Sequence, residues 1–171
     1  MKLILIAVCF VLLGAPVELQ KRTILNGKVE ILVPTEFKEM SEEMLNIKYR
    51  GQNKPTYVLS DSDGTVNVAF NLTNNKASEN LIVSYQTALK SSLAAAKPGT
   101  IWISDGMKTV NDKKVGYFKL ITDAADQKVY NYIFIANVDG KLLIATFNCI
   151  EKLMPEWESV AENIVGSLKI K

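Results

Sequence analysis

The sequence predicts an α+β protein, an α/β/α sandwich in which helices cover the faces of a central antiparallel sheet of about six or more strands. Three observations lead to this prediction. Four long strand-like segments follow one another across residues 101–150 with only short polar turns between them, a spacing that requires antiparallel neighbours. Two segments with apolar residues at helical spacing flank this block, and shorter strand-like segments precede it. Amphipathic helices bury their apolar stripes, so we expect them on the sheet.

The N-terminal segment predicts export. Lys2 is followed by an apolar run of 15 residues from Leu3 to Val17, shorter than the roughly 17 to 25 residues of a membrane-spanning helix and typical of a signal-peptide core. Ala15 suits the residue before a cleavage site, although Leu13 is large where a small residue is preferred. An uncleaved anchor and a buried element are the alternatives. We therefore assign residues 1–17 to a signal peptide or N-terminal anchor and residues 18–171 to a single domain.

The first structural element of the domain is a hairpin. Asn26-Gly27 separates two strand-like segments, 23–25 and 28–33, and both turn residues tolerate the positive φ that a tight hairpin needs. Pro34 ends the second strand. A short helix is expected from Ser41 to about Lys48.

Two further strands are predicted over 56–59 and 66–72, joined by Asp61-Ser62-Asp63-Gly64. This connection begins like a calcium-binding loop, whose later positions need oxygen ligands. Thr65 and Leu72 stand at two of those positions. We therefore expect a hairpin turn here and no metal.

A long helix is predicted from Glu79 to Ala96, with Ser78 as its N-cap and Lys97-Pro98-Gly99 as its end. Its apolar positions recur at helical spacing, and two more widen the stripe, so that one face should be buried. The stripe consists of Ile82, Tyr85, Leu89, Leu93 and Ala96, widened by Leu81 and Ala88.

The clearest block is a four-stranded antiparallel meander. Its expected strands are 101–110, 115–122, 129–138 and 142–150. A closing helix follows, with Pro155 in its first turn, where a proline is tolerated. The predicted buried stripe of this helix is Trp157, Val160, Ala161, Ile164 and Leu168.

Composition excludes several chemistries. The chain contains no histidine, which removes histidine-based nucleophilic, acid–base, zinc and haem chemistry. Its formal net charge is +2, with 20 basic and 18 acidic residues, so no global field favours nucleic acid. Cys149 is the single cysteine beyond the N-terminal run, and we expect it to be buried and unreactive. No cofactor and no catalytic residue is predicted, and the membrane is expected to matter only through an uncleaved N-terminal segment.

The order of these elements resembles the PsbP-like fold, which also includes the DcrB-like bacterial envelope proteins. The stretch from Val29 to Phe37 is similar to the opening of those domains, where a strand runs into a proline and then an aromatic residue. The resemblance spans about residues 24–170. It implies a sandwich around an antiparallel sheet, placement in the bacterial envelope, and a protein that binds other proteins or assists an assembly.

Two functions are compatible with these predictions. The first is a non-catalytic, periplasmic or envelope-associated protein that binds an unidentified partner protein; the second is a carrier of a small ligand or lipid in a cavity between sheet and helix. Aromatic and arginine side chains are the usual anchors of protein interfaces. Arg50 and Trp102 are the candidate contact residues. Their alternatives are a solvated surface charge for Arg50 and core packing for Trp102.

Overall fold

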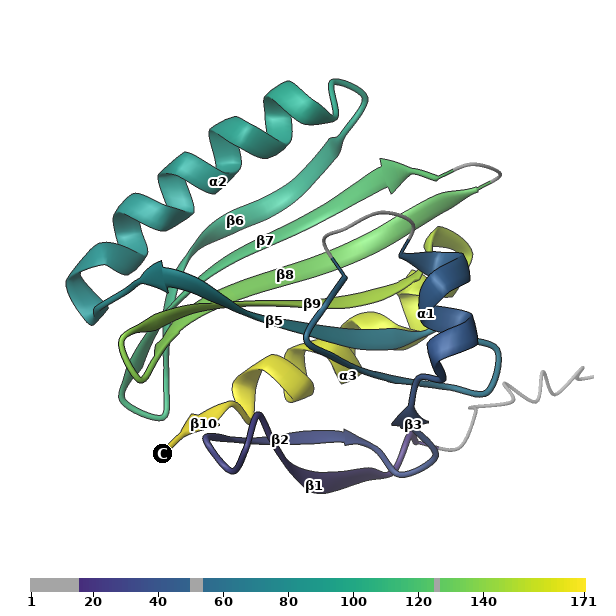
Figure 1. Cartoon of the computed structure of the whole chain (residues 1–171). Helices are drawn as coiled ribbons and strands as arrows, with labels where there is room; N and C mark the ends of the chain where they lie inside the picture. The colour runs from purple at the N-terminus through teal and green to yellow at the C-terminus, as the bar shows by residue number, and fades with distance from the viewer. Residues whose placement is uncertain (1–15, 50–53, 125–126) are drawn as a thin grey trace, which may run out of the picture.

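The structure, a computed structural model, describes residues 16–49, 54–124 and 127–171. These residues form a seven-stranded antiparallel sheet, a separate three-stranded sheet and three α-helices (Figure 1). The large sheet has the strand order β3-β4-β5-β9-β8-β7-β6 and the small sheet the order β1-β2-β10. The large sheet consists of β3 (Lys38–Glu39), β4 (Tyr57–Ser60), β5 (Asn67–Lys76), β6 (Ile101–Val110), β7 (Lys113–Asp123), β8 (Lys128–Val138) and β9 (Lys141–Ile150). The small sheet consists of β1 (Leu19–Ile24), β2 (Val29–Pro34) and β10 (Lys169–Ile170), and the helices are α1 (Glu42–Lys48), α2 (Ile82–Ala96) and α3 (Met154–Gly166).

The predicted fold class is confirmed. The four-stranded meander runs from β6 to β9 with neighbouring strands paired in sequence order. The first hairpin forms as expected, with Asn26 and Gly27 at φ 55° and 85° in its turn. It does not join the large sheet, however, because β2 pairs with the C-terminal strand β10 instead. Strands β3 and β10 have two residues each, too few to show a periodicity in the sequence.

One face of the large sheet, which we call the covered face, carries the main core. Alternate residues of β8, among them Tyr130, Tyr132 and Phe134, point toward α3 and the small sheet and are fully buried. Trp157 of α3 stacks on Phe147 of β9, with ring centroids 6.0 Å apart. The predicted stripe of α3 is confirmed for Val160, Ala161 and Ile164, which are buried, and for Trp157, which packs against the core; Leu168 is also buried but lies past the end of the helix.

Among the described residues, only the two ends of the opposite face, which we call the open face, are covered by helices. At one end, Met44 and Leu45 of α1 pack on Val58 and Ala69. At the other end, α2 lies over β7 and β8. Figure 1 shows the two helices apart, with the middle strands of the sheet running between them.

The prediction for α2 is wrong in part. Residues 79–81 form a 3₁₀ turn, so that the α-helix begins only at Ile82, and Ser78 makes no side-chain capping bond. Only Ile82 and Gln86 of the helix are buried. The stripe is narrower than expected because α2 contacts the sheet mainly where Gly116 lets it approach: a Cβ there would lie 3.1 Å from the Gln86 side chain. Leu81, Ala88 and Ala96 are exposed.

Candidate interaction surface

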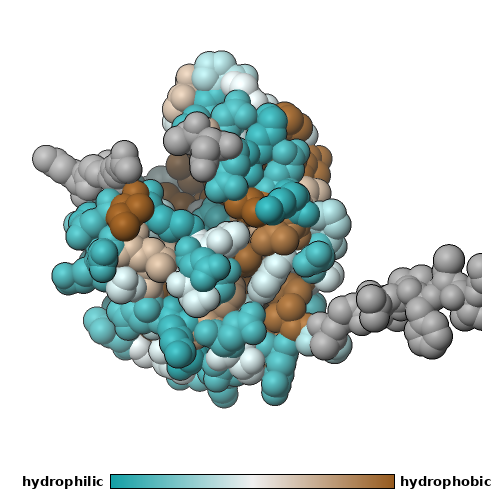
Figure 2. All heavy atoms as spheres, turned by 90° about the vertical axis from the view of Figure 1, so that its right-hand side faces the viewer, coloured by the Kyte–Doolittle hydropathy of each residue, from teal (hydrophilic) through white to brown (hydrophobic). Residues whose placement is uncertain are grey.

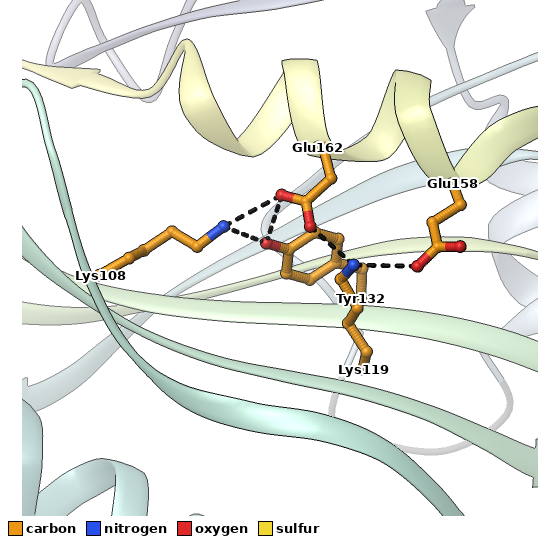
Figure 3. Close-up of polar contacts among 5 residues, drawn as sticks. All are labelled: Lys108, Lys119, Tyr132, Glu158 and Glu162. Atoms are coloured by element: carbon orange, nitrogen blue, oxygen red, sulfur yellow. Dashed lines mark hydrogen bonds and ion pairs between the residues drawn. The ribbon is translucent and has the colours of Figure 1, made fainter.

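A charged cluster lies on the covered face between α3 and the sheet (Figure 3). Lys119 of β7 reaches both carboxylates of α3, at 2.9 Å from Glu158 and 2.6 Å from Glu162. Glu162 also binds Lys108 of β6 at 3.0 Å and accepts a hydrogen bond from the Tyr132 hydroxyl at 2.9 Å. The Lys119 ammonium lies 5.2 Å from the centroid of the Tyr132 ring, within range of a cation–π contact.

The pKa shifts in this cluster favour the ordinary charge states. Burial alone would lower the pKa of Lys119, but its hydrogen bonds to Glu162 and Glu158 outweigh burial and raise that pKa. Burial would raise the pKa of Glu162, yet the bonds from Lys119, Lys108 and Tyr132 lower it. Burial and the bond to Glu162 raise the pKa of Tyr132. A general acid or base needs a pKa shifted toward neutrality. These groups shift away from it, and their ion pairs join α3 to β6 and β7.

The open face carries a different arrangement, a row of asparagines across three neighbouring strands. Asn67 of β5 lies opposite Asn148 of β9, and Asn148 lies opposite Asn131 of β8. The register continues through Leu120 of β7 to Trp102 of β6. Adjacent strands are about 4.8 Å apart, so the three amides form a continuous polar band.

Hydrogen bonds hold the side-chain amides of this row in place. The Tyr49 hydroxyl and the Asn148 amide both donate to Asn67 Oδ1, each at 3.1 Å. Asn131 donates to the Thr122 hydroxyl at 3.1 Å and to the Val129 carbonyl. Within the described residues, the side-chain oxygens of Asn131 and Asn148 accept no hydrogen bond. The row therefore presents two carbonyl oxygens for donors of another molecule.

The asparagine row lies in a surface hollow, which we call the asparagine groove. Two adjoining hollows of about 300 and 710 Å³ share Tyr49 and Asn148 in their walls. Figure 2 views the end of the molecule that carries α1 and shows the hollow beside this helix within a mostly hydrophilic surface. The described residues around the smaller hollow include no charged side chain. They are Tyr49, Pro55, Ala69, Phe70, Asn71, Asn131, Ile133, Ile144, Thr146 and Asn148.

The structure describes one of the two predicted contact residues. Trp102 is half-buried. Its ring meets Phe118 edge-on with centroids 6.2 Å apart, and the Lys90 ammonium lies 5.6 Å from its centroid. It therefore packs on the sheet at β6, two strands beyond Asn131 in the same register. Arg50 lies outside the described residues, next to Tyr49 in the sequence.

The other sequence candidates have structural roles. Asp61 accepts a hydrogen bond from the Val66 amide at 3.1 Å, and Asp63 accepts one from the neighbouring Ser62 hydroxyl at 2.7 Å. Both bonds belong to the turn between β4 and β5. Across residues 16–49, 54–124 and 127–171, no group of three or more acidic or cysteine side chains has the arrangement of a metal site. Cys149 is buried, and burial raises the pKa of its thiol to about 12.

Comparison with solved structures supports the PsbP-like fold. The chain is similar to cyanobacterial PsbP from Synechocystis, with a TM-score of 0.63 and 14% identity over 96% of this chain and 98% of that one. It is also similar to LpqN of Mycobacterium tuberculosis, described as involved in cell envelope biogenesis, with a TM-score of 0.55 and 12% identity over 90% and 91% of the two chains. A Bacteroides thetaiotaomicron protein matches with a TM-score of 0.58 and 11% identity, over 88% of this chain and 48% of that one.

At these identities the likeness establishes the fold. No protein-family model and no curated protein matches the chain. In the part of the chain that the structure describes, no helix has the length and apolar character needed to cross a membrane. Residues 3–15 of the N-terminal apolar run lie outside that part, whereas Val17, the last residue of the run, packs against the core.

Sequence reasoning missed the asparagine groove. Asn67, Asn131 and Asn148 are far apart in the chain, and no short motif joins them. The sequence shows only that each asparagine interrupts the apolar residues of a strand. Alternate residues of a strand share one face of the sheet, so each asparagine places a polar group on a face. Only the register of the strands shows that the three positions form one row.

Proposed function

We propose that this protein is exported and acts in the cell envelope as a non-catalytic protein that binds a partner protein. The observation that carries the proposal is the asparagine groove on the open face, whose smaller hollow has no charged side chain among the described residues around it. A partner segment that offers uncharged hydrogen-bond donors fits this groove, because the side-chain oxygens of Asn131 and Asn148 accept no hydrogen bond from any described residue, while their amide nitrogens donate.

Two further observations support the proposal. The similar structures include a protein described as involved in cell envelope biogenesis, and the N-terminal run has the form of a signal core. The absence of histidine from the whole sequence and the pKa shifts of the charged cluster favour binding over catalysis. On the covered face the carrier alternative has less support, since the rings of Phe147 and Trp157, with centroids 6.0 Å apart, occupy the space between the sheet and α3.

We further propose that Arg50 and Trp102 contribute to the partner contact. Trp102 lies on β6 in the same register, two strands beyond Asn131, and Arg50 follows Tyr49 in the sequence, which lines the groove. A partner segment that crosses the strands along the row would run from Tyr49 toward Trp102.

A photo-crosslinking amino acid at Asn131 tests the proposed site in the organism that makes the protein. We expect a discrete protein adduct from this position, and none from the exposed control position Thr23 on β1. Arg50→Ala and Trp102→Ala should lower the adduct yield. Because Trp102 is half-buried, yields are compared at equal amounts of folded protein. Equal adducts from Asn131 and Thr23 would refute the site.

Export is tested separately. Replacing Leu5 and Leu12 with arginine interrupts the apolar run, and this should retain the chain in the cytoplasm. Cell fractionation measures the result. An unaltered chain found freely soluble in the cytoplasm would refute export while leaving the groove to be tested.

A further inference from the structure

The two edges of the large sheet differ. At one edge, β3 has two residues, Lys38 and Glu39, both exposed and charged, which are features that prevent a sheet edge from pairing with another chain. At the other edge, β6 has ten residues and pairs on one side only, with β7, among the described strands. Its outer backbone groups are available to a further strand.

Exposed apolar side chains gather at the β6 edge. Among the described residues, six large apolar side chains are exposed, and three of them lie on β6. These three are Ile101, Ile103 and Met107, with 47%, 41% and 38% of their surface exposed; Leu81 precedes α2 and Val83 lies in its first turn. The sixth, Ile47 at 60%, lies on α1. A concentration of this kind marks an interaction surface.

The charges at this edge are compatible with an identical surface. Lys90 is the only charged residue of α2, and it binds Asp105 of β6 at 2.6 Å. Lys108 of β6 binds Glu162 on the covered face. Each charge therefore has an opposite partner within its own chain. Two copies can meet at β6 without unpaired like charges.

We propose that β6 pairs antiparallel with β6 of a second copy of this chain, across a two-fold axis perpendicular to the sheet. A two-fold axis makes identical edges antiparallel, which continues the pattern of the whole sheet. A bulge interrupts β6 between Trp102 and Ser104, so the regular edge runs from Ser104 to Val110. When this segment pairs antiparallel with the same segment of the second copy over its whole length, its middle residue, Met107, lies on the two-fold axis.

This register is consistent with the side chains of β6. It sets Asp105 opposite Thr109 of the second copy and Lys108 opposite Gly106 of the second copy, so that no like charges lie directly opposite each other. The two Lys108 side chains are diagonal neighbours, and each is bound to Glu162 of its own chain. Each side chain keeps its sheet face, as pairing requires. The asparagine groove lies over β5, β9 and β8, away from the axis, so the dimer leaves it open and goes beyond the proposed function.

Sedimentation equilibrium of the purified protein over a concentration series tests the dimer. We expect the average mass to rise toward twice that of one chain, Met107→Lys to give the monomer mass, and the matched control Ile47→Lys to behave like the native chain. A native chain that stays monomeric throughout the series overturns the proposal, as does an Ile47→Lys chain that dissociates as fully as Met107→Lys.

A cysteine variant tests the register and remains informative if Met107→Lys fails to fold. In a Cys9→Ser background, where Cys149 is buried, Met107→Cys should form an intermolecular disulfide on mild oxidation, because directly opposed residues have Cβ atoms about 4.5–5.5 Å apart. Ile47→Cys is the control. Absence of the Met107→Cys cross-link, or equal cross-linking of Ile47→Cys, overturns the symmetric pairing.

Discussion

The covered and open faces of the large sheet are built from the same strands but differ in chemistry. On the covered face, Tyr130, Tyr132 and Phe147 are fully buried, and the two lysines of the charged cluster bind the carboxylates of α3. On the open face, the side-chain oxygens of Asn131 and Asn148 lie in a hollow and accept no hydrogen bond from the described residues. Burying an unpaired polar group costs free energy. The difference indicates that one face stabilises the fold and the other can be used for recognition.

Substitutions at Thr146 and Phe147 allow a direct comparison of the two faces, because neighbouring residues of a strand point to opposite sides of the sheet. Phe147→Ala should lower the free energy of unfolding by about 4 kcal/mol, since it leaves a cavity beside Trp157 and Tyr130. Thr146→Ala, on the groove floor, should change it by less than about 0.5 kcal/mol. Urea unfolding measures both, and comparable losses would contradict the division between the faces.

The sequence was sufficient to predict only part of the covered face, the meander and the helix α3. The stripe of α3 and the meander follow from local periodicity and turn chemistry, which a single sequence displays. The small sheet could not be predicted, because β10 has two residues and its pairing with β2 joins the two ends of the chain.

The open face could not be predicted for a related reason. The asparagine row depends on the register of β5, β9 and β8, and register is a long-range property. The charged cluster of the covered face likewise joins Lys108 and Lys119 of the sheet with Glu162 of a helix that is distant in the sequence.

The apolar residues of α2 did predict a helix, but they did not predict which residues are buried. Gln86 is buried because its side-chain amide donates a hydrogen bond to Asp105 at 3.1 Å.

A second prediction compares two lysines, one on each face. The side chain of Lys119 is 12% exposed and binds two carboxylates, so Lys119→Met should lower the free energy of unfolding by about 1–2 kcal/mol, less than a fully buried pair because Glu158 and Glu162 can still reach water. Lys90→Met removes an exposed pair with Asp105 and should cost less than about 1 kcal/mol. Thermal unfolding of the two variants checks the order, which the reverse ranking would contradict.

A third prediction concerns the thiol of the covered face. Cys149→Ala should lower the free energy of unfolding by about 1 kcal/mol, because it removes a small, fully buried side chain. Burial raises the pKa of this thiol to about 12, so a thiol reagent should label it only after denaturation in a Cys9→Ser background. Labelling of the native protein at the rate of the denatured chain would show that the covered face opens readily.

The smallest expected effect is the pH dependence that the charged cluster contributes. The pKa of Glu162 is lowered from its ordinary 4.5, so its contribution to stability is complete above that value and is lost as pH falls through the lowered pKa. The pKa of Lys119 is raised from 10.5, so its contribution is complete below that value and is lost as pH rises through the raised pKa. For this reason, replacing Glu162 with glutamine (Glu162→Gln) should reduce the loss of stability at acid pH, seen as a flatter acid limb in a plot of urea midpoint against pH.

The effect is modest, because the Glu162 side chain is 40% exposed and screened by water. The matched control is Glu36→Gln, which changes an exposed carboxylate without an ion pair among the described residues. Equal flattening by both variants would show that the ion pairs of Glu162 do not contribute to stability.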